Sequence, residues 1–338
     1  MQTPPLKHSP PSSARDGMHD LRVMRYGFLL IENFSLIALG SAIDPLRIAN
    51  MILGRRVYDY SLVGPGNEFV RSSDGIRVVP DVSMSDSEPF DVVFVVGPNP
   101  IPKKGIGSII DWLRRQAGKG TALGGLDTGS YFLARAGLLN GYRCTIHWED
   151  QDVLTEQFPK LTVSTRLFEI DRDRYTCSGG VAPLDLMVHL LASPPGSQAL
   201  AARVLELLVA EPRSREYRQQ TSLRQYIGAE HAKLDEALQL MESNVEEPLS
   251  VPEIASQLRV SQRQLQRWFL ERLAKSPAEA YLEIRLLRAR QLLYRTATSL
   301  EEVCARTGFT STTHFSTRYK AQFQISPIAD RRRYQSAL

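Results

Sequence analysis

The last third of this 338-residue chain repeats its own pattern at a spacing of fifty residues. The shift brings residues of the same kind together: Ala255 on Ala305, Ser261 on Ser311, Leu265 on Phe315, Phe269 on Tyr319 and Ser276-Pro277 on Ser326-Pro327. A fixed period indicates that one supersecondary unit occurs more than once. Because strand-type patterns end before this region, we predict two copies of one helical unit.

Each copy contains a short helix (251–257 and 300–306), a turn, and a longer helix that ends before Ser-Pro. Ser261 and Ser311 are expected to be N-caps, because their hydroxyls can accept from the free amides of a first helical turn. The small side chains of Ala255 and Ala305 are expected to let the two helices cross closely, as a helix-turn-helix requires.

The second helix of each copy has one apolar and one polar face. The apolar face consists of Leu265, Trp268, Phe269 and Leu273 in the first copy and of Phe315, Tyr319 and Phe323 in the second. The polar face carries Gln262, Arg263, Gln266 and Arg267, then Thr312, Thr313, Ser316, Thr317 and Arg318. Gln and Arg can form paired hydrogen bonds with base edges, whereas Thr and Ser offer single ones. A merely solvated polar face is the alternative, but two copies at one offset favour contact with double-stranded DNA.

A connecting helix is predicted over residues 277–296, which spans about 30 Å at about 1.5 Å per residue. Successive major grooves on one face of the duplex lie roughly 34 Å apart. This helix can therefore hold two recognition helices in adjacent grooves. We expect some of its arginines to contact phosphates, the candidates being Arg285, Arg288, Arg290 and Arg295.

The charge of the chain is concentrated in the same region. Residues 231–338 contain 16 Lys and Arg against 12 Asp and Glu, so they carry the whole excess of +4, and the remainder balances. Excess positive charge on one module is the electrostatic signature of a polyanion-binding domain.

These features resemble an AraC-type DNA-binding domain over residues 231–335. The motifs that carry the resemblance are Ile254-Ala255, Ser261-x-Arg263-x-Leu265-x-Arg267-x-Phe269 and Gly308-Phe309-x-Ser311-x-x-x-Phe315-Ser316. The sequence departs from the pattern at Ala274 and Gln324, where the family usually has the glycine that ends the helix. Because such positions favour a left-handed backbone, we expect the helix ends to be reshaped or slightly destabilised there.

Residues 21–210 alternate strand-like and helix-like segments, which indicates an α/β domain with a mostly parallel sheet. The stretches 23–31, 91–97 and 121–126 are largely apolar, as in strands buried on both faces. The predicted helices are 36–53, 105–117, 129–139, 182–192 and 198–209, and 168–177 is predicted to form a hairpin. A disordered tail (1–20) precedes this domain, and a polar linker (211–230) separates it from the DNA-binding domain (231–338).

The stretch 123–129 is a small-residue strand exit that leads into a helix, with Asp127 at its apex. In strand-turn-helix elbows a Ser or Cys at this point is a nucleophile candidate. The domain resembles the class I glutamine amidotransferase-like superfamily, with its flavodoxin-like fold, in the form that regulators of the GlxA group place before an AraC-type domain. The resemblance rests on Phe34-Ser35-Leu36, 90–97, the elbow, Ala134-x-Ala136-Gly137-Leu138-Leu139-x-Gly141 and Thr145-Ile146-His147-Trp148.

The resemblance implies that Asp127 stands where the enzymes have Cys and that His147 stands at their His. We therefore expect no catalysis, and a pocket kept as a sensor site. Its expected ligand contacts are Asp127, Thr128, His147, Trp148, Glu149 and Phe34. Negative charge beside an aromatic face suits a small cation, and relatives of this architecture respond to carnitine, betaine-like compounds or arginine. The alternatives are that Asp127 only caps the next helix, Trp148 only packs, and His147 is a buried hydrogen-bonded residue.

The predicted protein is a ligand-responsive transcription regulator, more an activator than a repressor, which acts as a homodimer on a promoter operator. An activator also implies contact with RNA polymerase. One alternative is a hydrolase or amidotransferase with a DNA-binding appendage, and another is an architectural DNA-binding protein. We expect a cytoplasmic protein without membrane span, signal peptide, cofactor or metal, because three scattered cysteines form no metal or disulfide motif.

Overall fold

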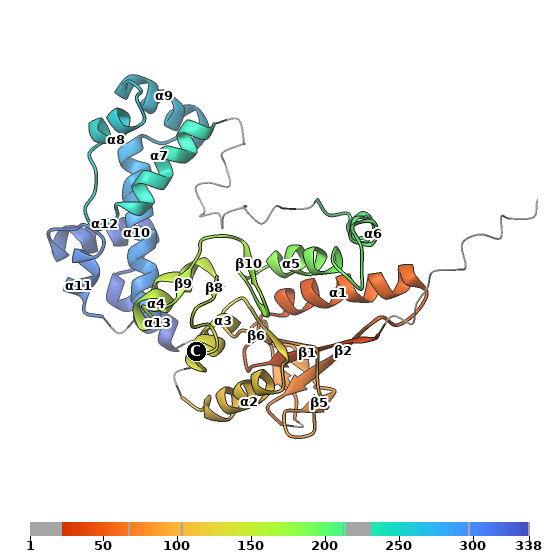
Figure 1. Ribbon diagram of the computed structural model, residues 1–338. Helices are drawn as coiled ribbons and strands as arrows, with labels where there is room; N and C mark the ends of the chain where they lie inside the picture. The colour runs from red at the N-terminus through yellow and green to blue at the C-terminus, as the bar shows by residue number, and fades with distance from the viewer. Residues whose placement is uncertain are drawn as a thin grey trace, which may run out of the picture. The chain divides into compact units, whose positions relative to one another are not determined.

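The computed structural model describes residues 22–66, 68–102, 104–211, 213, 231–296 and 298–336. These residues form two compact units (Figure 1). The first comprises the described residues within Met1–Ile146 and Lys160–Arg215, and the second comprises those within His147–Pro159 and Glu216–Leu338. The expected tail and most of the expected linker lie outside the described residues.

The first unit is built on a seven-stranded sheet with the order β10-β11-β7-β6-β1-β2-β5. Its strands are β1 (Met24–Leu30), β2 (Tyr58–Gly64), β5 (Val82–Ser83), β6 (Val92–Val96), β7 (Ala122–Leu126), β10 (Phe168–Asp171) and β11 (Arg174–Cys177). Every neighbouring pair is parallel except the β10–β11 hairpin. The domain therefore has the mostly parallel, flavodoxin-like sheet that the sequence predicts.

Helices cover both faces of this sheet (Figure 1). On one face α1 (Leu36–Leu53) packs against α5 (Ala182–Leu191) and α6 (Gln198–Leu208), and on the other α2 (Gly107–Gly118) packs against α3 (Gly129–Arg135). The central strand β6 is buried at every position, which explains its unbroken apolar sequence. Two small sheets join β3 (Val70–Arg71) with β4 (Arg77–Val78), and β8 (Arg143–Cys144) with β9 (Thr162–Val163).

Several elements differ from the sequence-based prediction, including β5, β8, β9 and α4 (Gln151–Gln157), which it does not contain, and two of the differences have a clear cause. The sequence predicts no strand at β2, because polar Asp59 and Ser61 interrupt its apolar pattern. The helix predicted over 129–139 ends at Arg135, since Gly137 takes a φ of 75° and turns the chain away. α3 is therefore a helix of only seven residues.

One helix of the described part of the chain, α1, is long and apolar enough by length and composition to cross a membrane, although the sequence predicts no membrane span. This helix has 18 residues and a mean hydropathy of 1.5. Asp44 and Arg47 interrupt its apolar sequence. A search for continuous apolar stretches therefore overlooks the high mean hydropathy of this helix. Its buried residues, among them Ala38, Ala42 and Leu46, face the interior of the first unit. α1 is thus a core helix of that unit.

All the regular elements in the described part of the second unit are helices. They are η1 (Trp148–Asp150), α4 (Gln151–Gln157), α7 (Ala232–Ser243), α8 (Val251–Gln257), α9 (Gln262–Leu273), α10 (Pro277–Arg295), α11 (Leu300–Ala305), α12 (Thr312–Phe323) and α13 (Pro327–Ser336). Each helix from α8 to α12 begins after a serine whose side chain accepts a first-turn amide, namely Ser250, Ser261, Ser276, Ser299 and Ser311.

The long helix α10 belongs to two separate apolar cores. Its first half packs with α7, α8 and α9 around Leu238, Ile254, Leu265 and Phe269. Its second half packs with α11 and α12 around Leu286, Val303, Phe315 and Tyr319. The 19 residues of α10 span about 28 Å at about 1.5 Å each, close to the predicted length.

The two copies of the repeat align at two spacings. The N-caps of the short helices, Ser250 and Ser299, are 49 positions apart, whereas those of the long helices, Ser261 and Ser311, are 50 apart. The second copy therefore contains one additional residue between its two N-caps.

This extra residue changes which small side chain lies at the helix crossing. Ala255 is buried, and its structural counterpart is Cys304, which is 3% exposed. Ala305 is exposed. The prediction that Ala305 lies at the crossing is wrong, because a single offset of fifty was applied to both helices.

Candidate functional site

The elbow between β7 and α3 holds Asp127 in a left-handed backbone conformation, with a φ of 61°. Non-glycine residues rarely adopt this conformation, and it is common at functional turns. Neighbouring glycines make the turn possible. A Cβ on Gly125 would lie 2.3 Å from the Ser130 nitrogen, and one on Gly129 would lie 2.1 Å from the Val95 oxygen. α3 therefore begins directly against the backbone of the sheet, with Asp127 half-buried at the turn.

The elbow lies at the carboxyl edge of the parallel strands, after β7, which is next to β6 and thus one strand away from the point where the strand order reverses. β1 has β2 on one side and β6, which follows later in the chain, on the other. Ligands of open α/β sheets usually bind outside this point. Hydrogen bonds join the turns that follow β1, β6 and β7. Ser35 N donates to Gly97 O at 3.2 Å, and Thr128 Oγ1 donates to Pro98 O at 2.6 Å.

Two residues that the sequence predicts as ligand contacts are enclosed in this joint. Phe34 is fully buried, and Thr128 is 1% exposed. Backbone bridges link Phe34 to Ser72 and Pro98. Neither side chain presents surface to solvent, so both support the turn from beneath, and their contact with a ligand stays a prediction.

Cys177 lies beneath the elbow. It pairs with Leu126 in the β7–β11 register, and the backbone amide of Asp127 hydrogen bonds its sulfur. Burial raises the pKa of the Cys177 thiol well above its ordinary value, and the nearby carboxylates of Asp127 and Asp185 raise it further. Because the thiolate is the nucleophilic form of cysteine, this sulfur is poorly suited to attack a substrate.

The other two cysteines are also held as thiols. Burial raises the pKa of Cys144 to about 12 and that of Cys304 to about 11, and nearby carboxylates contribute in both cases. The elbow itself carries a carboxylate. Such a group can bind a cation but lacks the polarizable sulfur of a cysteine nucleophile.

Asp127 is not the N-cap of α3, which was one alternative reading of its position. The cap residue is Thr128, and its side chain makes no capping hydrogen bond. The left-handed backbone of Asp127 also differs from the extended conformation of a usual cap.

The remaining predicted ligand contacts belong to the segment His147–Pro159, which clusters with the second unit. His147 Nδ1 accepts from the Glu149 amide at 3.4 Å, and the rings of His147 and Trp148 lie 5.7 Å apart. The side chains of His147 and Glu149 are 24% and 31% exposed, and Trp148 is half-buried. The alternatives, in which Trp148 only packs and His147 is buried, require core residues. Neither aromatic residue is a core residue.

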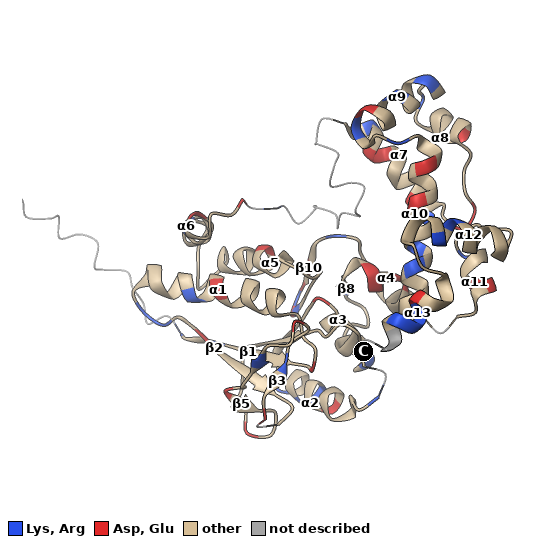
Figure 2. Cartoon of the chain, turned by 180° about the vertical axis from the view of Figure 1, so that it is seen from behind, with Lys and Arg blue, Asp and Glu red and all other residues tan. Residues whose placement is uncertain are grey.

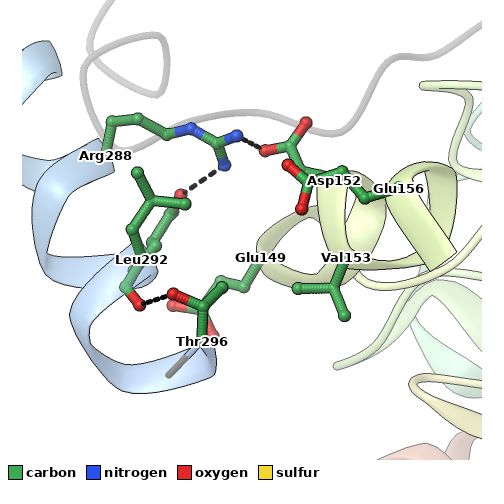
Figure 3. A pocket seen from close by; sticks show the side chains of 8 residues that line it. Glu149, Asp152, Val153, Glu156, Arg288, Leu292 and Thr296 are labelled. Atoms are coloured by element: carbon green, nitrogen blue, oxygen red, sulfur yellow. Dashed lines mark hydrogen bonds and ion pairs between the residues drawn. The ribbon is translucent and has the colours of Figure 1, made fainter. Parts of the chain in front are cut away.

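The second unit also contains a small pocket between α4 and α10 (Figure 3). Figure 3 shows the guanidinium of Arg288 directed at the carboxylate of Asp152, with which it forms an ion pair. Burial lowers the pKa of Arg288 to about 10, and nearby Arg306 contributes. Arg288, expected among the phosphate contacts, is engaged within the unit.

Two other arginines of α10 are also engaged within the unit. Arg285 Nε donates to the Thr307 carbonyl at 2.8 Å, and Arg290 Nε donates to the Asp330 carboxylate at 2.9 Å. The side chain of Arg295 lies outside the described residues. The guanidinium groups of Arg285 and Arg290 bind neighbouring elements to α10. The structure therefore gives no support to the expectation that these two arginines contact phosphates.

The polar face of α9 is open. Gln262, Arg263, Gln266 and Arg267 are all exposed, and the Arg267 side chain makes one ion pair, with Glu271 at 3.8 Å. Figure 2 shows the concentration of Lys and Arg on α9, α10 and α13. The structure thus brings the predicted base-reading residues of the first copy together on one free surface.

The polar face of α12 is less available. Thr312 and Ser316 are half-buried, while Thr313, Thr317 and Arg318 are exposed. Thr317 Oγ1 donates to the Thr313 carbonyl at 2.9 Å, and Arg318 Nε donates to His314 Nε2 at 3.3 Å. These side chains are partly occupied within their own helix.

Sequence reasoning missed the buried acid Asp185 on α5, whose side chain is 4% exposed, and its partner Arg213. The available signal was an aspartate inside the otherwise apolar sequence APLDLMVHLL, because a buried charge requires a partner. Within the described ranges, no group of three or more His, Cys, Asp or Glu side chains is placed to hold a metal ion.

Two family models match the chain. One, described as DJ-1/PfpI family, matches residues 28–193, and the other, described as Helix-turn-helix domain, matches residues 254–333. The structure is also similar to a crystal structure of an AraC family transcriptional regulator from Pseudomonas putida. The TM-score is 0.51 at 32% identity, over 55% of this chain and 99% of that one.

Curated relatives match nearly the whole chain. The HTH-type transcriptional regulator GbdR of Pseudomonas aeruginosa is 43% identical over 306 residues, which cover 90% of this chain and 83% of that protein. The HTH-type transcriptional regulator GlxA of Rhizobium meliloti is 38% identical over 316 residues, which cover 92% and 96%. The chain therefore belongs to the GlxA- and GbdR-type transcriptional regulators, in which a DJ-1/PfpI domain precedes an AraC-type helix-turn-helix domain.

Proposed function

We propose that this regulator responds to a small cationic or zwitterionic effector, of the carnitine, betaine or arginine type, bound beside Asp127. The observation that carries this proposal is the position of Asp127. A half-buried carboxylate occupies a left-handed elbow at the carboxyl edge of the sheet, after β7, one strand away from the point where the strand order reverses. A carboxylate there supplies charge for a cation and no nucleophile for an acyl transfer.

The chain path supports a contribution from His147, Trp148 and Glu149. Ser130 Oγ, three residues after Asp127, donates to the Thr145 carbonyl at 2.7 Å. His147, Trp148 and Glu149 follow Thr145 within four residues in the sequence, and this proximity along the chain is the support for including them. The Trp148 ring then offers a π face for a quaternary ammonium or guanidinium group.

DNA recognition in this proposal rests mainly on α9. Its exposed Arg263 and Arg267 suit guanine, and Gln262 and Gln266 suit adenine. α12 contributes through Thr312, Thr313, Ser316, Thr317 and Arg318, with fewer base contacts and more phosphate contacts. The regulator acts in the cytoplasm as a homodimer on a promoter operator and, as an activator, also contacts RNA polymerase.

The DJ-1/PfpI domain acts in this proposal as a sensor and not as an enzyme. Support comes from the carboxylate at the elbow and from the raised pKa values of all three cysteines. A burst of labelling by a thiol-reactive probe at Cys177, together with turnover of an amide or glycated substrate, would contradict this assignment.

Calorimetric titration of the full chain with carnitine, glycine betaine, choline and arginine tests the effector proposal. We expect one of them to bind, and Asp127→Asn to weaken that binding about tenfold, equivalent to about 1.4 kcal/mol. Asp111→Asn, at an exposed carboxylate on α2, is the matched control and should leave affinity unchanged. Binding that is indifferent to both Asp127→Asn and Trp148→Ala would refute the cation site.

A further inference from the structure

The carboxylate of Asp185 is held by Arg213, which lies beyond the last helix of the first unit. Asp185 lies in the first turn of α5. Arg213 donates to it three times: from its backbone amide to Oδ1 at 3.1 Å, and from Nε and Nη2 to Oδ2 at 3.0 and 2.5 Å. A guanidinium and a backbone amide that bind one carboxylate fix both the side chain and the course of the main chain.

The burial of Asp185 makes this contact strong. Its side chain is 4% exposed, while that of Arg213 is 31% exposed. A buried carboxylate is stable only when it is paired and hydrogen bonded. Arg213 is therefore more than a surface side chain, because its guanidinium neutralises a charge inside the domain.

The same carboxylate lies near the elbow. Asp127 and Asp185 both raise the pKa of the Cys177 thiol through their charges, so the sulfur lies within electrostatic range of both. The Asp127 amide hydrogen bonds that sulfur. Cys177 ends β11, and only the turn at Gly179 and Gly180 separates this strand from α5. β11 and this turn thus connect the strand beside the elbow to the first turn of α5.

Arg213 also holds a special position along the chain. It follows α6, whose last residue is Leu208, and the next residue that the structure describes is His231, at the start of α7. Arg213 is thus the last described residue before the DNA-binding unit.

We propose that Asp185 and Arg213 form a clasp that couples the effector site at Asp127 to the connection leading to the DNA-binding unit. Arg213 and Asp185 are positioning residues in this scheme, because neither needs to touch effector or DNA. Effector binding alters the clasp, and the clasp alters how the DNA-binding unit is presented to the operator. The coupling part rests on the proposed effector site, whereas the anchoring part does not.

The first experiment tests anchoring in the full chain without any effector. Hydrogen exchange of the peptide that spans residues 209–213 reports on the Arg213 amide, which donates to Asp185. We expect Asp185→Ala to accelerate this exchange at least tenfold while strand β6 stays protected, which shows that the sheet is intact. Unchanged exchange at 209–213 would overturn the clasp.

The second experiment measures coupling. Operator affinity of the full chain is compared with and without the effector that the titrations identify, and the ratio of the two affinities reports the coupling. We expect Arg213→Ala to bind the effector as the parent does but to reduce a ratio of about tenfold, typical of such coupling, to below twofold. Arg203→Ala is the matched control, because Arg203 is an exposed arginine of α6 that pairs only locally with Glu206. The coupling would be overturned if Arg213→Ala kept the affinity ratio of the parent, or if Arg203→Ala reduced that ratio as much as Arg213→Ala does.

A third measurement separates this inference from the effector proposal. If none of the four compounds binds the parent protein, the effector proposal fails. The coupling is then judged by exchange at 209–213 in Asp127→Ala, with Asp111→Ala as control. We expect a change of at least threefold in Asp127→Ala only, and identical exchange in the two variants would refute the coupling.

Discussion

Arg290 of α10 and Asp330 of α13 form an ion pair, with 2.9 Å between Nε and Oδ2, in which the Asp330 side chain is only 4% exposed. The hydroxyls of Tyr294 and Tyr319 also donate to this carboxylate, at 2.9 and 2.7 Å. Asp330 thus joins three helices, α10, α12 and α13, through one buried group. The second helix-turn-helix copy depends on a polar network as well as on its apolar core.

Removal of this carboxylate should destabilise the DNA-binding unit. We expect Asp330→Ala to reduce its free energy of unfolding by about 3 kcal/mol, because it removes the buried carboxylate that accepts from Arg290 and from two tyrosine hydroxyls. Calorimetric unfolding of the full chain gives the measurement. Glu236→Ala, at a carboxylate that is 52% exposed, serves as the control and should change stability by less than about 0.5 kcal/mol. Equal effects of both variants would contradict the structural role of Asp330.

The same network predicts a pH dependence. Burial alone would raise the pKa of Asp330, but hydrogen bonds from Tyr319, Tyr294 and Arg290 outweigh it and hold the pKa below its ordinary value. A group with a depressed folded-state pKa stabilises the protein above its unfolded pKa, about 3.9, and loses this contribution as the pH falls through the folded value. The difference in melting temperature between the parent and Asp330→Asn should therefore shrink as the pH falls from about 5 towards 2. A constant difference across this range would show that Asp330 is not ionised in the folded protein.

Much of the fold could be predicted because its signals are local. The unbroken apolar sequence of β6 and the serine caps of α9 and α12 identify their elements without tertiary information. The strand β2 carries Asp59 and Ser61, so its place in the sheet depends on pairing with β1 and not on its own pattern. The extra residue in the second copy is likewise visible only when buried positions of the two copies are compared.

The candidate site could be predicted only in part. The elbow motif located Asp127 correctly at the turn between β7 and α3, because small residues at fixed positions encode a close approach of backbones. The clasp between Asp185 and Arg213 joins residues 28 positions apart in sequence, and no motif links them. Similarly, Arg290 resembles any exposed helix arginine until the fold brings Asp330 beside it.

Two helix ends offer a test of backbone strain. Ala274 and Gln324 take left-handed conformations after α9 and α12, with φ values of 52° and 59°. A side chain in this conformation costs roughly 1–2 kcal/mol, and glycine avoids much of that cost. We expect Ala274→Gly to raise the free energy of unfolding by about 0.5–1 kcal/mol, measured by calorimetry.

The same substitution inside a helix supplies the control. Ala321 is an exposed residue within α12, where Ala→Gly should cost about 1 kcal/mol because glycine has low helix propensity. Opposite signs at Ala274 and Ala321 are the expected result. Destabilisation at both positions would mean that the left-handed ends are not strained.

The exposed face of α9 leads to a prediction about operator recognition. Arg263→Ala and Arg267→Ala should each weaken binding to the specific operator by roughly 1–3 kcal/mol, because each removes a potential bidentate contact with a guanine edge. The measurement is a binding titration on the operator and on a scrambled duplex at fixed salt concentration. The loss should be confined largely to the operator, and single-base changes in the half-site should no longer matter at the position that each arginine reads.

Salt dependence distinguishes this assignment from simple charge neutralisation. A residue that contacts only phosphate weakens binding to all sequences and lowers the slope of log affinity against log salt concentration by about one. Thr313→Ala on α12 provides the comparison, because a single hydroxyl contact is worth less than a paired one, and we expect a smaller loss there. If Arg263→Ala and Arg267→Ala instead weaken operator and scrambled duplex equally, α9 lies along the phosphate backbone, and base reading must come from another surface.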